Sequence, residues 1–192
     1  MERELLVTGI GGQGVQLMAT VLARAAVSEG RGVQLFGSYG GMMRGGNTDA
    51  TLVVADGPVR SPPTVHSAWS AVLMHHEHAA GTVARVRPGG VVFVNTSVCA
   101  GDVAEGRRAV AVAATDVAAG LGDPLVAAMV MAGAYVACTG LVSLDALRRA
   151  AAAALPARRA RHGARNDEAL VAGSGLVRAL GAPAWALEPR AS

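Results

Sequence analysis

In the first part of the chain, short apolar runs are separated by longer segments of helical periodicity. The runs predict strands at residues 4–8, 33–36, 48–55, 70–74, 91–95 and 109–113. Helical periodicity predicts helices at residues 15–30 and 76–86. Because strands and helices alternate, we expect an α/β fold with a Rossmann-like open parallel sheet and helices on both faces.

The pattern changes at Asp116, after which helical periodicity dominates and predicts a helical C-terminal third. The expected helices span residues 117–121, 124–140, 143–155 and 167–180, and an extended tail follows them. We see neither an internal repeat nor a low-complexity linker. We therefore expect a single domain over residues 1–192.

Composition narrows the class of protein. Hydrophobic residues make up 52% of the chain and charged residues 16%, which excludes disorder and favours broad subunit contact. The formal net charge of +3 is too small to predict nucleic-acid binding. Six arginines lie between residues 148 and 165 without interleaved aromatic side chains, so we expect a solvated or subunit-facing surface there.

One uncharged stretch could be either a membrane-spanning helix or a buried helix. Residues 124–144 carry no charge over 21 positions, a length that could cross a bilayer. The stretch is rich in Ala and Gly and lacks flanking basic residues and aromatic belts, which favours a buried helix. The N-terminus MERELLVTGI does not have the pattern of a secretion signal. We expect no membrane association and a cytoplasmic location.

Two features could suggest a metal site. Cys99 and Cys138 are isolated, without a C-x-x-C motif, so they predict neither zinc nor an iron–sulfur cluster and leave a disulfide open on count alone. His75, His76 and His78 follow the predicted strand 70–74, but two nitrogens on one helix face lack a clear third ligand. We expect no metal and a solvated or interface turn.

The first predicted strand leads into the glycine-rich turn G-I-G-G-Q-G. The candidate binding residues in it are Gly9, Gly11, Gly12, Gln13 and Gly14. Such a turn before a helix presents backbone N–H groups and a partial positive charge to an anionic group. A dinucleotide site would also need a carboxylate about 20 residues further on. The second predicted strand ends in Gly37-Ser38 without one, which weakens that interpretation and leaves a turn used only for packing as an alternative.

A second glycine-rich loop spans residues 37–47, with five glycines. Its candidate binding residues are Ser38, Tyr39, Arg44, Gly45 and Gly46. An arginine between glycines suits bidentate capture of a carboxylate or phosphate, and the alternative is an arginine that binds carbonyls of its own loop. Asn95, at the end of a predicted strand, could direct its amide toward the same crevice or cap the next turn. We find no pair of nucleophile and general base, so we expect no catalytic residue in this chain.

The segments GIGGQGV, SYGGMMRGGN and PGGVVFVN, in this order, resemble the gamma subunit of 2-oxoacid:ferredoxin oxidoreductases. Further matches occur at VRSP (residues 59–62), around Gly122-Asp123-Pro124, and at Asn166, Ala169 and Gly173. The resemblance covers about residues 3–178. The two glycine loops together are more specific than either one alone.

The resemblance implies a function in a complex. Members of this family oxidatively decarboxylate a 2-oxoacid, transfer the acyl group to coenzyme A and pass electrons to ferredoxin. It implies alpha and beta partner subunits, with or without delta, that hold thiamine diphosphate and iron–sulfur clusters. It implies no cofactor bound by this chain alone, with coenzyme A contacting its crevice. The alternatives are a free-standing Rossmann-type dinucleotide-binding oxidoreductase and a non-enzymatic nucleotide-binding assembly module.

Overall fold

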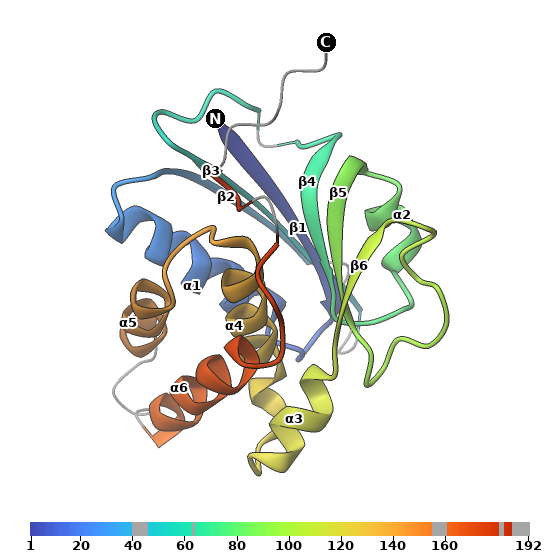
Figure 1. Cartoon of the computed structure of the whole chain (residues 1–192), viewed down its shortest axis with the longest axis vertical. Helices are drawn as coiled ribbons and strands as arrows, with labels where there is room; N and C mark the ends of the chain where they lie inside the picture. Colours follow the sequence, from blue (N-terminus) through green and yellow to red (C-terminus); the bar gives the residue numbers. More distant parts are fainter. Residues whose placement is uncertain (40–45, 63, 155–160, 181–182, 186–192) are drawn as a thin grey trace.

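The computed structural model describes residues 1–39, 46–62, 64–154, 161–180 and 183–185 (Figure 1). Six strands and seven helical segments follow one another along these residues. In chain order they are β1 (Glu2–Ile10), α1 (Val15–Ser28), β2 (Gly32–Tyr39), β3 (Asn47–Ala55), β4 (Ala68–Leu73), α2 (Ala79–Val83), β5 (Val86–Asn95), β6 (Arg108–Val112), α3 (Ala114–Gly120), the short 3-10 helix η1 (Pro124–Val126), α4 (Ala127–Thr139), α5 (Leu144–Ala154) and α6 (Arg161–Ser174). The α/β class and the helical C-terminal part are confirmed.

The strands form one sheet in the order β2-β3-β1-β4-β5-β6. Strands β1, β4, β5 and β6 run parallel, as expected. The expectation of a parallel sheet fails at β3 alone, which runs antiparallel to both β1 and β2, so β2 has the same direction as β1. Only residues 40–46 connect β2 to β3. A parallel crossover needs about a dozen residues or more, so this short connection requires a reversal of direction.

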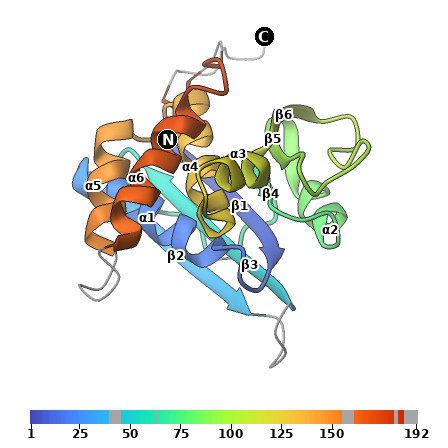
Figure 2. The same cartoon turned by 90° about the horizontal axis from the view of Figure 1, so that it is seen from below.

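Helices α1 and α4 lie against one face of the sheet, α5 and α6 pack on them, and α3 packs beside α4 (Figures 1 and 2). Inward side chains of β1 and β3, such as Leu5 and Leu52, share a buried cluster with α1, α4, α5 and α6. Helix α4 lies in the middle of this layer, and 12 of its 13 residues are buried. The larger part of the uncharged stretch at residues 124–144 is therefore the buried helix α4, whereas Leu125 before it is exposed. In the part of the chain that the structure describes, no helix is both long enough and apolar enough to span a membrane.

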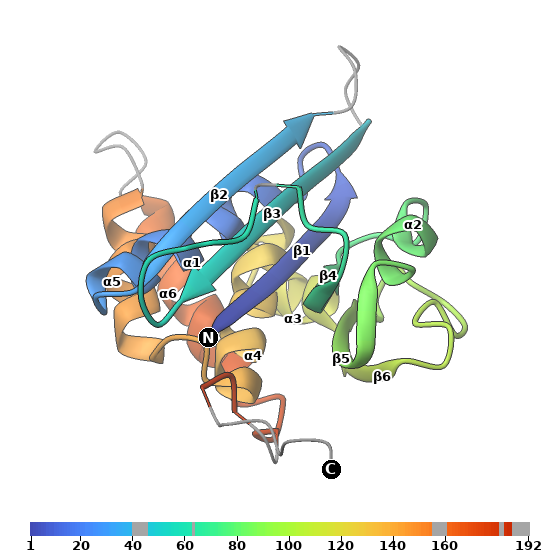
Figure 3. The same cartoon turned by 90° about the horizontal axis from the view of Figure 1, so that it is seen from above.

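The other face has a thinner cover. The strand side chains that point to this face, such as Leu6 and Val53, pack in a second cluster with Ala79 and Val83 of α2. The segment between β3 and β4 also passes over this face (Figure 3). Helices therefore lie on both faces as expected, but unequally, because α2 has only five residues.

Several boundaries differ from the sequence prediction. The helix expected at residues 76–86 shrinks to α2, because Val86 already pairs with Ala68 as the first residue of β5. The Pro88-Gly89-Gly90 turn is absorbed as an irregularity within that strand. A Cβ atom on Gly90 would lie 2.7 Å from the carbonyl oxygen of Trp69, so a glycine allows this close approach.

The two cysteines belong to different packing clusters. Cys138 lies in the cluster on the helical face, and Cys99 lies in the cluster under α2. Both are free and buried, so the structure excludes the disulfide that the count of two allowed. Burial raises the pKa of both thiols, which disfavours the reactive thiolate.

Candidate functional site

The sheet has a topological switch point between β1 and β4. These parallel neighbours lead to helices on opposite faces, β1 to α1 and β4 to α2. Open α/β sheets bind ligands beyond the carboxyl ends of strands at such a point. The glycine turn of residues 9–14 follows β1, and residues 74–78 follow β4. These two segments form the centre of the candidate site.

The first glycine turn uses much of its own hydrogen-bonding capacity. The N–H of Ile10 donates to Oε1 of Gln13 (2.9 Å), and the N–H of Gln13 donates to the carbonyl of Ile10 (3.2 Å). The N–H of Gly11 donates to the carbonyl of Gly46 (2.9 Å). Three donors that could face a phosphate are thus engaged within the protein. This turn is a weaker anion cradle than its sequence suggests.

Glycine is needed in this turn for two distinct reasons. Gly12 and Gly14 have φ angles of 100° and 79°, in the left-handed region that favours glycine. Gly9 and Gly14 also allow close packing: a Cβ on Gly9 would lie 2.7 Å from Oε1 of Gln13, and one on Gly14 would lie 2.9 Å from Cβ of Ala128. The alternative in which the glycines serve packing is therefore supported at Gly9 and Gly14.

The start of α1 remains suited to an anion. Helix α1 has 14 residues, begins after Gly14, and has no side-chain cap at its N-terminus. The first N–H groups of such a helix lack partners within the helix and carry a partial positive charge. Beyond the glycine turn, the N-terminus of α1 is thus the part of this site that fits a negatively charged group.

The two glycine loops lie together. The bond from Gly11 to Gly46 joins the turn after β1 to the end of the second loop. Ser38 is exposed on β2, opposite Asp49 in the strand register. The backbone of Tyr39 ends β2, and Arg44 and Gly45 lie outside the described residues. The structure therefore places part of the second loop at the site and leaves the capture of an anion by Arg44 a prediction.

Asn95 is fully enclosed. Its relative exposure is 0%. Its Nδ2 donates to the carbonyl of Met74 (3.3 Å) and to Oγ1 of Thr115 (2.9 Å), and its Oδ1 accepts from the N–H of Thr115 (3.3 Å). The side chain thus connects the end of β4 to the start of α3. In this conformation its polar atoms form hydrogen bonds within the protein.

The sequence analysis did not identify a polar cluster beside these loops. The hydroxyl of Thr8 donates to Oδ1 of Asp49 (2.6 Å), and Nδ2 of Asn47 donates to Oδ2 of Asp49 (2.8 Å). A cavity of about 350 Å³ adjoins them; its lining residues are Asn47, Asp49, Glu77, His78, Ala80, Gly81, Thr82 and Arg85. The signal available in the sequence was an aspartate inside the apolar strand T-D-A-T-L-V-V-A.

The histidines after β4 occupy different positions. His75 and His76 stack, with ring centroids 4.4 Å apart and planes inclined by 25°. His78 precedes α2 and lines the cavity. Among the described residues, no group of three or more His, Cys, Asp or Glu side chains is placed to hold a metal ion.

Comparison with known proteins shows the family of the chain. The family model for pyruvate ferredoxin/flavodoxin oxidoreductase matches residues 4–176. The pyruvate/ketoisovalerate oxidoreductases common subunit gamma of Thermococcus kodakarensis is 32% identical over 156 residues, which cover 77% of this chain and 83% of that one. The ketoisovalerate oxidoreductase subunit VorA of Methanothermobacter marburgensis is 33% identical over 144 residues, 75% of this chain but only 30% of that one. The chain therefore spans less than a third of VorA.

A solved structure shows the same fold. The crystal structure of the keto/oxoacid ferredoxin oxidoreductase gamma subunit from Geobacter sulfurreducens PCA superposes with a TM-score of 0.74 at 27% identity, covering 92% of this chain and 96% of that one. The resemblance noted in the sequence is thereby confirmed. The chain belongs to the pyruvate ferredoxin/flavodoxin oxidoreductase family and is similar over most of its length to gamma subunits.

Proposed function

We propose that this member of the pyruvate ferredoxin/flavodoxin oxidoreductase family serves as the gamma subunit of a thiamine diphosphate-dependent 2-oxoacid:ferredoxin oxidoreductase. The complex would decarboxylate a 2-oxoacid oxidatively to an acyl-coenzyme A and pass electrons to ferredoxin. The observation that carries the proposal is the family match over residues 4–176 together with the similarity to a complete gamma subunit.

The chain would contribute structure and a coenzyme contact, while alpha and beta subunits, with or without delta, hold thiamine diphosphate and iron–sulfur clusters. Its two thiols are buried, and burial raises their pKa, so they are poor nucleophiles. The start of α1, which has no side-chain cap, would face a phosphate of coenzyme A at the switch point. The residues of the turn that are not engaged in internal bonds would lie beside it.

The free-standing dinucleotide-binding oxidoreductase is less well supported. Three N–H groups of the first glycine turn are engaged internally, and no carboxylate ends β2, whose last residues are Gly37, Ser38 and Tyr39. A titration with NADH and NADPH tests this alternative. Micromolar binding of either cofactor to the chain by itself would favour it over the gamma-subunit proposal.

Co-expression tests the main proposal. The tagged chain is produced together with the proteins encoded beside it and purified on the tag. We expect a brown complex with broad absorbance near about 400 nm, from iron–sulfur clusters in partner subunits. The purified complex should reduce an electron acceptor only when both a 2-oxoacid and coenzyme A are present. A panel of pyruvate, 2-oxoglutarate, 2-oxoisovalerate and indolepyruvate then identifies the substrate.

The control is the same tagged chain produced without its neighbours, which should be colourless and inactive. A colourless, stable monomer from the co-expression itself would contradict the proposal. That result would favour the third candidate, a nucleotide-binding assembly module that acts without the oxidoreductase subunits.

A further inference from the structure

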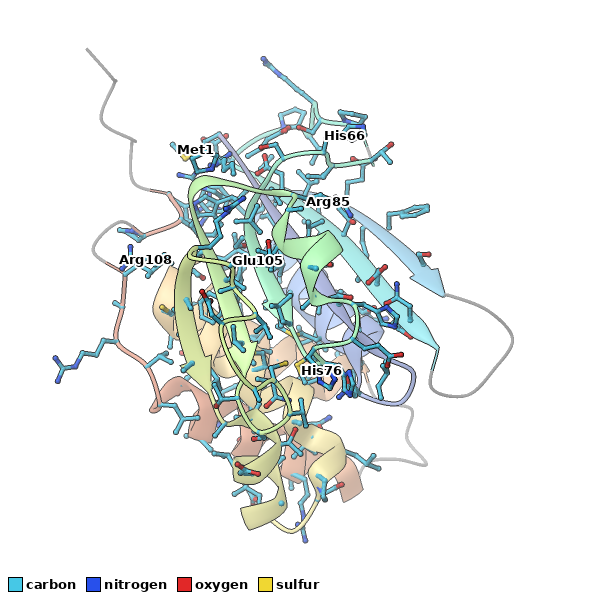
Figure 4. The ribbon with its side chains drawn as sticks, turned by 90° about the vertical axis from the view of Figure 1, so that its right-hand side faces the viewer. Met1, His66, His76, Arg85, Glu105 and Arg108 are labelled. Carbon is cyan, nitrogen blue, oxygen red and sulfur yellow. The ribbon has the colours of Figure 1, made fainter. Side chains whose placement is uncertain are left out.

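The two outer strands of the sheet differ in how well they are protected against pairing with another strand. Strand β6 has only five residues, follows Arg107 and begins with Arg108, at the edge opposite to β2 (Figure 4). Strand β2 has eight residues, and none of them is charged or a proline. Short length and charged side chains protect an edge from pairing, and β2 has neither. The edge formed by β2 is therefore the one that a further strand can extend.

The hydrogen bonds of the sheet show which backbone groups point outward from β2. At one end of the β1–β3 pair, the N–H of Asp56 donates to the carbonyl of Met1 (3.1 Å). At the other end, the N–H of Gly11 donates to the carbonyl of Gly46 (2.9 Å). Hydrogen-bonded pairs alternate along an antiparallel ladder, so the even-numbered residues of β3 bond to β1, and its odd-numbered residues bond to the even-numbered residues of β2. The β2 residues whose N–H and carbonyl groups face away from β3 are then Val33, Leu35, Gly37 and Tyr39. In the part of the chain that the structure describes, no strand pairs with them.

Apolar side chains are exposed along the same edge. Phe36 is 56% exposed and Leu35 is 37% exposed, and as neighbours in a strand they point to opposite faces of the sheet. The segment after β3 covers only the start of β2, where a Cβ atom on Gly32 would lie 2.0 Å from the carbonyl oxygen of Gly57 (Figure 3). Exposed apolar side chains thus lie beside backbone groups that point outward. This combination is typical of an interface rather than of a solvated edge.

We infer that β2 pairs with β2 of a second copy of this chain, antiparallel about a two-fold axis at Phe36. The two sheets then continue into one another through an interface in which each copy offers the same strand. A second copy suits this edge because its β2 is also uncharged, so no charge is buried along the paired strands. Pairing of β2 with β6 would repeat without closing and build a filament, whereas pairing of β2 with β2 closes after two copies.

The position of the axis follows from the outward-facing groups. With the axis at Phe36, Leu35 lies opposite Gly37 of the second copy, and the outward-facing N–H and carbonyl groups of β2 all find partners. Phe36 then faces its own counterpart at a non-hydrogen-bonded position, where facing side chains approach most closely. An axis at Leu35 would instead place Phe36 opposite Gln34 and would need Arg31, which lies outside β2.

A buried oxygen beside this edge fits the same pairing. Oε1 of Gln34 is buried and has no hydrogen-bond partner among the described residues. In the proposed pairing Gln34 lies opposite Ser38 of the second copy, and both side chains are on the face of Phe36. Ser38 is exposed, and its hydroxyl can donate. Rotation of the Gln34 amide toward the edge would let its oxygen accept from that hydroxyl, so the second copy would supply a donor.

Sedimentation equilibrium of the purified full chain tests the dimer. The inference goes beyond the proposed function and does not depend on it, because this measurement needs no other subunit. Phe36→Lys removes the aromatic pair and places two like charges opposite each other at the axis, so we expect the dissociation constant of the dimer to rise about tenfold or more. Val171→Lys, at an apolar residue of α6 that is 46% exposed, is the matched control and should dimerise as the unaltered chain does. Circular dichroism checks that both variants fold.

Engineered cysteines test the position of the axis. Facing residues at a non-hydrogen-bonded position of an antiparallel pair have Cα atoms about 4.5 Å apart, which is within the range of a disulfide. Phe36→Cys should therefore link two copies on mild oxidation, as non-reducing electrophoresis shows. Leu35→Cys lies opposite Gly37 rather than its own counterpart and should not link them. Cys99 and Cys138 are free and buried, and the unaltered chain is the control for any link through them.

Any of three results would overturn the inference. These are a chain that stays monomeric at its highest soluble concentration, a dimer that Phe36→Lys does not weaken, and a link through Leu35→Cys in place of Phe36→Cys. A monomeric chain whose Phe36→Lys variant recovers less of the alpha and beta subunits on co-expression would assign the edge to a partner subunit instead. Failure of the gamma-subunit proposal is seen separately, as the absence of those subunits from the material purified with the unaltered chain.

Discussion

Gly133 of α4 and Gly173 of α6 occupy reciprocal positions where these two helices cross. A Cβ atom on Gly133 would lie 2.0 Å from the carbonyl oxygen of Leu170 in α6. One on Gly173 would lie 1.9 Å from the carbonyl oxygen of Val130 in α4. Each helix backbone thus rests directly on the glycine of the other. Since α4 is the central helix of its layer, this glycine pair sets the spacing of the helical face.

Alanine at either glycine should force the two helices apart. We expect Gly133→Ala and Gly173→Ala each to lower the free energy of unfolding by about 1–3 kcal/mol or more, as overpacking does. Chemical denaturation measures the change. Gly120→Ala is the control, because a Cβ atom on this exposed residue of α3 would have no neighbour within 4 Å, and alanine is the better helix former, so stability should not fall. Wild-type stability in both test variants would show that the crossing can relax.

Asn95 should prove to be a structural residue in this conformation. Asn95→Ala leaves the N–H and hydroxyl of Thr115 without their partner and removes one donor from the carbonyl of Met74. We expect the free energy of unfolding to fall by about 1–3 kcal/mol. Thr96→Ala, at the exposed neighbour, should have little effect. An Asn95→Ala chain of normal stability whose complex needs more coenzyme A would instead support a direct contact with the ligand.

Tyr135 should contribute to the loss of stability in alkali. Burial raises its pKa above the usual value of about 10, although its hydroxyl bonds to Oγ of Ser70 (2.8 Å). The pKa of Tyr135 is higher in the folded chain than in the unfolded chain. Its contribution to the free energy of unfolding is therefore complete below about pH 10 and is lost as the pH rises further. Tyr135→Phe should therefore show a shallower decline in unfolding free energy above about pH 10. The two cysteines titrate in the unaltered chain and in Tyr135→Phe alike. Parallel stability curves for these two proteins in alkali would therefore contradict a role of Tyr135.

The ion pair between Arg148 of α5 and Asp167 of α6 should affect how the free energy of unfolding changes at low pH. Nε and Nη2 of Arg148 donate to the carboxylate of Asp167 at 2.6 and 2.8 Å, and these bonds lower the pKa of Asp167. A lowered pKa adds stability above the unfolded-state value and loses it as the pH falls through the folded-state value. Arg148→Ala should therefore flatten the acid limb of the stability curve below about pH 4.

Salt provides the check on this ion pair. Both side chains are 42% exposed, so the difference between Arg148→Ala and the unaltered chain should be small and should shrink in molar salt. Arg149→Ala, at the adjacent exposed arginine, should leave the acid limb unchanged. A difference that does not depend on salt would point to lost packing rather than lost charge.

Local sequence pattern predicted much of the fold correctly. The first strand, the glycine turn and the first helix lie at β1, residues 9–14 and α1, because a buried strand and an amphipathic helix depend mainly on neighbours in sequence. The order of the two glycine loops was sufficient to indicate the family, which the match over residues 4–176 confirms. The boundaries of α2 and β5 were not predictable in this way, because the pairing of Val86 with Ala68 joins residues from separate segments.

By itself, the sequence determined the α/β class, the helical C-terminal part and the conformations that require glycine, since these follow from periodicity and local backbone freedom. Only the tertiary structure decided the antiparallel direction of β3, the enclosure of Asn95 and the engagement of Gly11 with Gly46. In each of these cases the result depends on a group from a distant part of the chain that folding brings near. Whether a polar atom is already hydrogen-bonded within the protein or can still bind a ligand depends on that group.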